Sequence, residues 1–394
     1  MEKKTINLYV SLVAMMQLMF GLHAAVYVIF LLQNNLSLFQ VSLVNLCFMS
    51  DVFLFEIPTG AVADIAGRKI SFVLSNIICG IGFIYYSMGD NFTEFIVAEV
   101  ILALGVTLTS GALRAWLVDS LHHYGWNGNL VDVFRLEGRV GNIALLIGGI
   151  VGAYLGKADL SRPFLVVGVC SLALALYVWI VMKEDYWINK EENERNFFQN
   201  MKKVASESIA YGLKHQTIFV VISSSVIMVL AMQAFNMYWQ PWFRPDLPGN
   251  EYLGYIWAGV VIFTVIGNEL VSWFTKKFQN IKYGYLVIGE SIACLMILSV
   301  VCHNFYVSLM FFWAHELFRG IFRPYTNAVI QENTPSHTRA TVDSFVSMMQ
   351  KGAAAIGLFS FGLIADKGSI GLSWIIASLF IALILPFILL IKRR

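Results

Sequence analysis

Three charged side chains recur at spacings of three and four residues within an apolar stretch late in the chain. They are Glu316, Arg319 and Arg323, and His315 directly precedes them. This spacing places all three on one face of a helix. Since a guanidinium binds carboxylate or phosphate groups through two hydrogen bonds, the two arginines would suit an anionic substrate. Alternatively, Glu316 neutralises Arg319 and Arg323 pairs with Glu332, and the sequence leaves both readings open.

Acidic and histidine side chains in apolar stretches are candidates for carrying a proton. A carboxyl group whose charged form is disfavoured by burial, or a histidine, changes protonation near neutral pH. The principal candidates are Asp51, Glu56, Glu316 and His315, and the further ones are Glu99, Glu269, Glu290 and His23. Among the acids, Asp51 and Glu316 are the first choices. A lone buried histidine is more often a packed polar residue than a proton relay.

Amide, histidine and aromatic side chains are spaced along two apolar stretches, one at each end of the chain's first 240 residues. They are Gln17, His23 and Tyr27 in the first stretch, and Gln233, Asn236 and Trp239 in the second. Together with Arg319 and Arg323, they would line a cavity for an organic molecule of mixed polarity. The alternative is that about half of them face neighbouring helices.

The composition indicates that the elements carrying these residues lie in lipid. Hydrophobic residues make up 58% of the chain and charged residues only 13%, whereas soluble domains carry about 25% charged residues. Such a chain could not cover its surface in water, but it suits a bilayer. No basic patch indicates nucleic acid, and neither metal-ligand spacing nor a phosphate-binding loop is present. The sequence therefore predicts no metal, no cofactor and no ATP-driven pump.

Twelve apolar stretches are long enough to cross a bilayer, which takes about 20 helical residues. The predicted spans are residues 6–32, 37–61, 70–89, 92–119, 132–155, 162–183, 215–240, 252–275, 282–302, 304–329, 341–365 and 370–391. A charged break divides them into two sets of six, and its apolar residues recur at the spacing of an amphipathic surface helix. The predicted domains are therefore 1–184, a cytoplasmic linker at 185–214, and 215–394.

The distribution of basic residues and a weak internal repeat complete the predicted fold. With the N-terminus in the cytoplasm, most of the 27 lysines and arginines fall on the cytoplasmic side, as the positive-inside rule requires. Val131-Asp132-Val133-Phe134 and Val342-Asp343-Ser344-Phe345 each open a span, which suggests an ancient duplication. The expected fold is an all-α integral membrane protein, with two pseudo-symmetric six-helix bundles and both termini cytoplasmic.

A loop motif between the second and third spans resembles a family signature. The segment Gly60-Ala61-Val62-Ala63-Asp64-Ile65-Ala66-Gly67-Arg68-Lys69 is similar to that of the major facilitator superfamily. The resemblance covers the whole chain. It implies a monomeric secondary transporter in the cytoplasmic (inner) membrane of a bacterium, working by alternating access on a small molecule, with protons as the coupling ion and the proton motive force in place of a cofactor.

The same resemblance implies a cytoplasmic latch. Its members would be Gly60, Asp64, Gly67, Arg68, Lys69 and Asp119. Gly67 permits a sharp turn, and Arg68 would reach Asp119 at the inner end of the fourth span. The alternative is that Arg68 and Lys69 only hold the loop on the cytoplasmic side.

Two ion pairs between the bundles would form an inner gate. In this family, spans two and eleven are neighbours, and Asp51 and Lys351 lie at matching depths, about 14 Å from the inner edge at 1.5 Å per residue. Spans five and eight are the other neighbours, which brings Glu269 together with Arg139 or Arg135. The alternative is that each charge pairs within its own half; Glu137 and Asp132 are the nearby acids.

Two departures from the family's drug exporters bear on the direction of transport. Glu99 is the nearest charged residue to a position where exporters often carry arginine, and the glycine-rich stretch at 141–152 lacks their Gly-Pro pair. The chain's size and single loop motif nevertheless favour proton-coupled export of a drug or metabolite. The alternative is proton-coupled uptake of an anionic metabolite or a metal-chelating organic acid. Neither an enzyme nor a channel is favoured, because no nucleophile has a plausible base and the loop motif implies alternating access.

Overall fold

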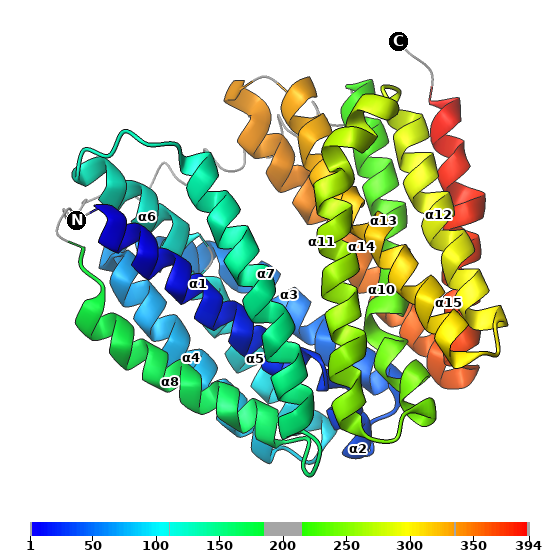
Figure 1. The fold of residues 1–394 in the computed structure, drawn as a ribbon, viewed down its shortest axis with the longest axis horizontal. Helices are drawn as coiled ribbons and strands as arrows, with labels where there is room; N and C mark the ends of the chain where they lie inside the picture. The colour runs from blue at the N-terminus through cyan, green and yellow to red at the C-terminus, as the bar shows by residue number, and fades with distance from the viewer. Residues whose placement is uncertain (1, 110, 185–214, 335, 392–394) are drawn as a thin grey trace. The chain divides into compact units, whose positions relative to one another are not determined.

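Long apolar helices dominate the computed structural model, which describes residues 2–109, 111–184, 215–334 and 336–391 (Figure 1). Within its helices, the side chains of residues 57–58, 60–65 and 336–341 lie outside that description. The predicted amphipathic linker at 185–214 also lies outside the described residues.

The helices follow one another through short connections. The first half of the chain forms α1 (Glu2–Ala24), α2 (Tyr27–Gln33), α3 (Leu38–Ala66), α4 (Arg68–Met88), α5 (Phe92–Thr109), α6 (Ala112–His123), α7 (Leu130–Leu155) and α8 (Arg162–Val181). The second half forms α10 (Gln216–Phe243), the short helices η2 (Arg244–Asp246) and η3 (Asn250–Tyr252), α11 (Leu253–Lys277), α12 (Ile281–Val301), α13 (Phe305–Asn333), α14 (Ser336–Lys367), α15 (Ile370–Ile384) and η4 (Leu385–Leu390).

Eleven helical segments in the described part of the chain are long and apolar enough to cross a membrane, with α1–α2 and α5–α6 each counted as one. α13 falls outside this set because His315, Glu316 and Arg319 lower its hydropathy. At 29 residues it is still long enough to span a bilayer. The predicted all-helical membrane fold is confirmed, and α13 corresponds to the tenth predicted span.

Capping residues account for several helix starts. The Ser37 hydroxyl accepts a hydrogen bond from the backbone N–H of Gln40, and the Gln40 side chain accepts one from the N–H of Ser37. This reciprocal pair satisfies two free donors at the start of α3. Asn129, Asn280 and Asn304 cap α7, α12 and α13 in the same general way. Polar residues in the loops therefore set where the apolar spans begin.

The residues cluster into two compact units. The first unit comprises Met1–Glu191 and Leu247–Val261, and the second comprises Glu192–Asp246 and Ile262–Arg394. The segment Leu247–Val261 belongs to the first unit through contacts with α7 and the loop that follows it. Lys157 Nζ lies 2.9 Å from Glu251 Oε1, and the hydroxyls of Tyr154 and Tyr255 are 2.6 Å apart. The hydrogen bond to Glu251 raises the pKa of Lys157, which therefore stays charged at neutral pH.

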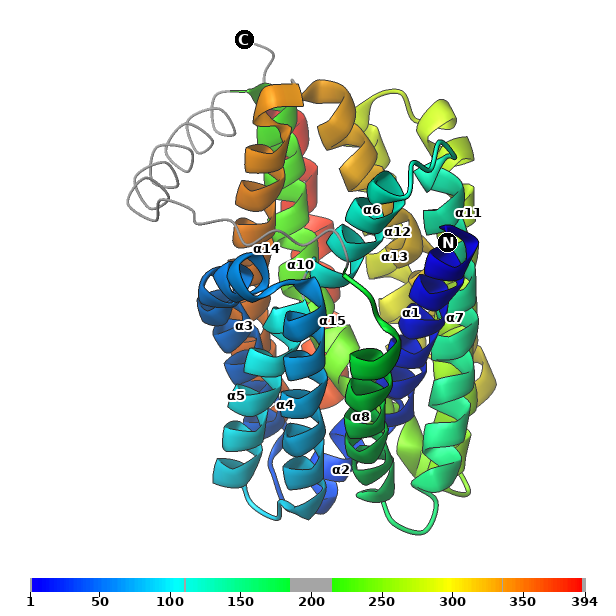
Figure 2. The same cartoon turned by 90° about the vertical axis from the view of Figure 1, so that its left-hand side faces the viewer.

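In the first unit, α1 packs along α7, α4 packs along α8, and α5 contacts both α3 and α4 (Figures 1 and 2). Glycines allow the α1–α7 contact. A side chain at Gly148 or Gly152 would overlap the backbone carbonyl oxygen of Leu18 or Leu22. Small residues at such positions let membrane helices approach closely, which compensates for the absence of a hydrophobic driving force in lipid.

In the second unit, α10 packs against α14 and α15, and α12 packs against α13 and α15. Gly357 on α14 lies against the Leu230 carbonyl oxygen of α10. The Trp374 indole on α15 donates a 3.0 Å hydrogen bond to the Ala234 carbonyl of α10. These contacts join α14 and α15 to α10.

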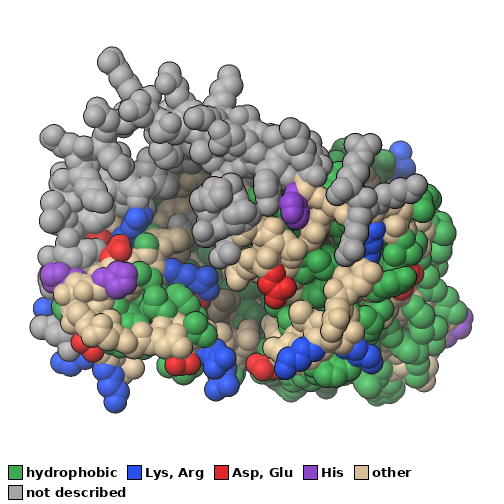
Figure 3. Space-filling model, turned by 90° about the horizontal axis from the view of Figure 1, so that it is seen from above, with side chains coloured by type: hydrophobic (Ala, Val, Ile, Leu, Met, Phe, Trp, Pro, Cys, Tyr) green, Lys and Arg blue, Asp and Glu red, His purple; other side chains and the backbone are tan. Residues whose placement is uncertain are grey.

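Both charged and apolar side chains are exposed on the described part of the chain. Figure 3 shows lysine, arginine, acidic and histidine side chains beside apolar ones. Large apolar side chains are exposed along the helices, as Leu176, Trp179 and Ile180 are on α8. Such an exposed apolar surface fits contact with lipid.

Candidate functional site

Glu316 on α13 is a buried carboxylate with two partners on two helices. Its side chain is only 3% exposed, and its Oε2 lies 2.7 Å from Nε of Arg319 on the next turn. The same oxygen accepts a 3.3 Å hydrogen bond from the hydroxyl of Thr264 on α11. Because a buried charge is stable only when paired and hydrogen-bonded, these contacts stabilise the ionised carboxylate. The structure thus contains the Glu316–Arg319 pair that the helical spacing allows.

Arg319 extends this group to a third helix, since its guanidinium donates a hydrogen bond to Oδ1 of Asn236 on α10. Asn236 is exposed and the Arg319 side chain is 28% exposed, so these two side chains form the solvent-accessible part of this group of polar residues. We call Asn236, Thr264, His315, Glu316 and Arg319 the Glu316 cluster. Since Glu316 neutralises Arg319, the accessible part offers hydrogen-bonding groups with little net charge.

His315 is fully buried beside Glu316. Its Nδ1 contacts the Phe312 carbonyl oxygen, and its Nε2 lies 3.6 Å from Glu316 Oε1, which is beyond ordinary hydrogen-bond length. The rings of Phe235 and Phe312 lie 5.8 and 4.8 Å from the imidazole. The aromatic surroundings fit a packed polar histidine, and the relay role stays a prediction.

Two glycines explain how Thr264 reaches Glu316. A side chain at Gly320 on α13 would overlap the carbonyl oxygen of Thr264, and one at Gly267 on α11 would overlap that of Leu317. The two helices therefore meet backbone to backbone at this level. The sequence contains both glycines, but nothing in their spacing shows that they face each other.

In the first unit, the predicted cavity residue Tyr27 contacts an acid that sequence analysis ranked only among the further candidates. The Tyr27 hydroxyl donates a 2.8 Å hydrogen bond to Oε1 of Glu99, which is 4% exposed on α5. Asp51, a first-choice acid, lies on α3 and accepts a hydrogen bond from the Cys47 thiol at 3.1 Å. Glu56, further along α3, is exposed. Burial thus distinguishes Glu99 from the two acids that sequence analysis preferred on this side.

A second polar group in the first unit joins α1, α6 and α7. Glu137 on α7 accepts hydrogen bonds from Arg114 Nη2 at 2.8 Å and from the Tyr9 hydroxyl at 2.6 Å. Arg135 lies 3.8 Å from Asp132 in an exposed pair, which contributes little in water. Arg135 thus pairs with an acid in its own half of the chain, which is the alternative to its pairing with Glu269. The sequence does not indicate the Arg114–Glu137 pair, because the two residues belong to different helices.

The loop motif contains a feature that the signature does not predict. Gly67, at φ +97°, separates α3 from α4. The backbone N–H groups of Arg68 and Lys69 donate to the two carboxylate oxygens of Glu184 at 2.7 and 3.1 Å. A carboxylate at a helix N-terminus satisfies free donors and interacts favourably with the helix dipole. The Lys69 ammonium lies 5.2 Å from the Trp179 ring on α8. Trp179 near the end of α8 and Glu184, three residues after that helix, therefore hold the start of α4.

Replacing Glu184 by glutamine should lower the free energy of unfolding by about 1 kcal/mol, because it removes the charge at the start of α4 while one amide oxygen can still accept a hydrogen bond. Glu184→Ala should cost more, because both N–H groups lose their acceptor. Thermal unfolding of the purified protein measures the difference. Equal stability of both variants and the wild type would mean that this cap contributes nothing.

The remaining residues of the predicted latch and gate lie on several helices of both units. Gly60 and Asp64 lie in the segment 60–65 of α3, whose side chains are outside the description, and Asp119 lies half-buried on α6. Asp51 and Arg139 belong to the first unit, whereas Lys351 and Glu269 belong to the second. The Arg68–Asp119, Asp51–Lys351 and Glu269–Arg139 pairings stay predictions.

The other predicted cavity residues make mostly structural contacts. The His23 ring lies among Phe20, Phe83 and Phe164, with centroids 4.8–5.9 Å away. Gln233 is 7% exposed and donates to the Val229 carbonyl on its own helix, and Trp239 is 5% exposed and stacks on Phe312. Gln17 is half-buried on α1, and Arg323 is exposed on α13. Among the residues predicted on the first and seventh spans, Tyr27 contacts the buried acid Glu99 and Asn236 contacts Arg319, the partner of Glu316.

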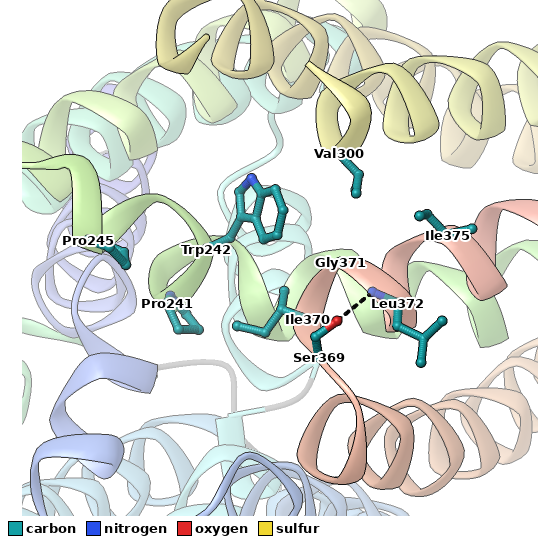
Figure 4. A pocket seen from close by; sticks show the side chains of 9 residues that line it. All are labelled: Pro241, Trp242, Pro245, Val300, Ser369, Ile370, Gly371, Leu372 and Ile375. Carbon is teal, nitrogen blue, oxygen red and sulfur yellow. Dashed lines mark hydrogen bonds between the residues drawn. The ribbon is translucent and has the colours of Figure 1, made fainter. Parts of the chain in front are cut away.

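A pocket of about 630 Å³ lies at one end of α10, α12 and α15 in the second unit (Figure 4). Its walls are mostly apolar: Pro241, Trp242, Pro245, Val300, Ser369, Ile370, Gly371, Leu372 and Ile375. It includes no member of the Glu316 cluster. Among the side chains that the structure describes, no group of three or more histidine, cysteine or acidic residues could hold a metal ion.

Comparison with known proteins agrees with this architecture. The sequence profile of the Major Facilitator Superfamily matches residues 9–301. An uncharacterized MFS-type transporter of Bacillus subtilis (strain 168), YxaM, is 23% identical over 97% of this chain and 94% of its own length.

Solved structures with similar folds are also transporters. The nucleoside transporter NupG superposes with a TM-score of 0.81 at 12% identity, over 99% of this chain and 100% of that one. A bacterial homologue of the human lysosomal transporter Spinster superposes with a TM-score of 0.75 at 14% identity, over 99% of this chain and 96% of that one. The chain therefore belongs to the major facilitator superfamily and is a multi-pass membrane protein that acts as a secondary transporter of small molecules.

Proposed function

We propose that this transporter exports a small cationic or neutral organic molecule in exchange for protons, driven by the proton motive force and without a cofactor. The observation that carries the proposal is the neutralised Arg319, whose Nε lies 2.7 Å from the Glu316 carboxylate. A guanidinium paired in this way donates hydrogen bonds but attracts an anion only weakly. Asp51 and Glu99 add acidic groups, which accept hydrogen bonds from a thiol and a phenol. Neither acid forms an ion pair with a described residue, and such an acid suits a proton or a cationic substrate.

In this proposal the protein is a monomer in the cytoplasmic (inner) membrane. The distribution of lysine and arginine supports an orientation with both termini in the cytoplasm. Asn236 and Arg319 hydrogen-bond the substrate, and alternating access carries the substrate and the proton in opposite directions.

A second candidate is proton-coupled uptake of an anionic metabolite or a metal-chelating organic acid. Arg323 favours this candidate. Its side chain is exposed, and it lies on the same helix as the partly exposed Arg319, four positions further along. Two arginines on one face suit carboxylate or phosphate groups. In this case Arg323 supplies the positive charge for the substrate, because Glu316 neutralises the charge of Arg319.

A liposome assay separates the two candidates. Purified protein is reconstituted with a pH-sensitive dye inside, a proton gradient is imposed, and pools of cationic drugs, neutral metabolites, organic anions and metal chelates are added. Export predicts that a cationic or neutral compound moves against the protons, with protein-free liposomes as the control. Proton movement together with an anionic compound would establish uptake instead, and no proton movement with any pool would reject proton coupling for these compounds.

A further inference from the structure

Glu99 and Tyr27 meet inside the first unit, where an acid is hard to ionise. Glu99 is 4% exposed on α5, and its Oε1 accepts a 2.8 Å hydrogen bond from the Tyr27 hydroxyl. The Tyr86 ring is 1% exposed and lies 6.2 Å from the Tyr27 ring. Tyr86 also stacks on Phe164 at 5.1 Å. The carboxyl group therefore lies among phenol and phenyl rings with little access to water.

The groups that face Glu99 include no cation among the described residues. Its electrostatic neighbours are Tyr27 on α2, Tyr86 on α4 and Asp51 on α3, and Asp51 is bonded to the Cys47 thiol. An ionised carboxylate without a cationic partner is costly inside a bilayer, and a nearby second carboxylate disfavours its charge further. Glu316 contrasts with it, because Arg319 compensates that charge at 2.7 Å. Of these two buried acids, Glu99 is the one whose environment favours a bound proton.

The backbone next to this pair is interrupted. α1 ends at Ala24 and α2 begins at Tyr27, and the residues between them, Ala25 and Val26, are fully buried. Non-helical backbone at membrane depth occurs where it is buried in protein or lines a cavity, and discontinuous helices are common at transport sites. Tyr27 is the first residue of the short helix α2, so a shift of α2 relative to α1 would carry its hydroxyl away from Glu99.

We propose that Glu99 is a proton-binding site of this transporter and that Tyr27 is its positioning residue. The carboxyl group holds a proton while the aromatic side chains exclude water and the Tyr27 hydroxyl hydrogen-bonds to it. When α2 moves and water enters, the proton passes to water and the carboxylate is left hydrated. Asp51, which is half-buried on α3 and interacts electrostatically with Glu99, is an acidic group that can accept the proton as it leaves. This inference deepens the proposed function and rests on it for its role in transport.

The test measures the proton on the acid directly and needs no substrate. The full-length protein in lipid vesicles is examined by infrared difference spectroscopy between acidic and alkaline buffer, since a protonated carboxyl group gives a C=O band that a carboxylate lacks. Wild type is expected to show such a band, and Glu99→Gln to lose the component that comes from Glu99. Glu94→Gln, on the same helix at a partly exposed position, and Glu316→Gln should retain that component. A spectrum of Glu99→Gln identical to that of wild type would overturn the proposal.

Tyr27→Phe provides an independent check if Glu99→Gln fails to fold. Removing the phenol hydroxyl removes the hydrogen bond to the carboxyl group, so the C=O band should shift to higher frequency; an unshifted band would contradict the role of Tyr27. The liposome assay separates this inference from the proposed function. If the liposome assay shows proton-coupled transport but the infrared band is unaffected by Glu99→Gln, the proton site at Glu99 alone is rejected. If the band is assigned to Glu99 but no proton-coupled transport is found, the proposed function alone is rejected.

Discussion

Replacing Arg319 by alanine should abolish transport and lower the free energy of unfolding by about 3–5 kcal/mol, the usual effect of removing one partner of a buried pair. Glu316 is 3% exposed and its recorded cationic partner is Arg319, so the variant leaves a buried carboxylate without compensation. Asn236 also loses its bond to the guanidinium. Thermal unfolding of purified protein measures the stability, and the liposome assay measures transport.

Two further variants control this experiment. Arg323→Ala, on the same helix at an exposed position, should change the stability by less than about 0.5 kcal/mol. The double variant Glu316→Gln, Arg319→Ala should recover most of the stability, because the buried charge is gone, but it should not recover transport. If Arg319→Ala is as stable as Arg323→Ala, Arg319 does not stabilise Glu316. If Arg323→Ala abolishes transport while remaining stable, the uptake candidate gains support.

Gly152→Ala should destabilise the first unit by about 1–3 kcal/mol, as overpacked contacts do. A methyl group at this position on α7 would overlap the carbonyl oxygen of Leu22 on α1, and two backbones must then move apart. Because α1 also carries the residues that lead into the break before Tyr27, transport should fall together with stability. Thermal unfolding and the yield of folded protein after extraction report the effect.

Gly138→Ala is the matched control, since it makes the same substitution on the same helix. No atom lies within 4 Å of the added methyl group there, so the variant should be neutral or stabilised by about 0.5–1 kcal/mol through the lower chain entropy of alanine. Equal stability of the two variants would contradict the close approach of α1 and α7.

Helix-level organisation could be predicted from the sequence because it depends on local quantities. Apolar length and turn residues predict the spans, and α13 is recognised although His315, Glu316 and Arg319 reduce its hydropathy. The pairing of Glu316 with Arg319 follows from a spacing of three residues on one helix. The motif around Gly67 likewise indicates a turn, and the structure places that glycine at a positive φ.

Contacts between helices could not be predicted in this way. Thr264 and Asn236 reach the Glu316 cluster from α11 and α10, and Glu184 reaches the start of α4 from more than a hundred residues away. Whether two such residues meet depends on the rotation and depth of each helix, which are set by the packing of small residues such as Gly320 and Gly267.

The sequence by itself therefore determined an α-helical membrane transporter, its spans and the charged stripe of α13. Tertiary structure decided which groups from other helices surround each acid: it placed Thr264 beside Glu316 and Asn236 beside Arg319, and it enclosed Glu99 among the rings around Tyr27. The physical reason is that the free energy of a buried charge depends on groups within a few ångströms in space, and most of these come from other helices.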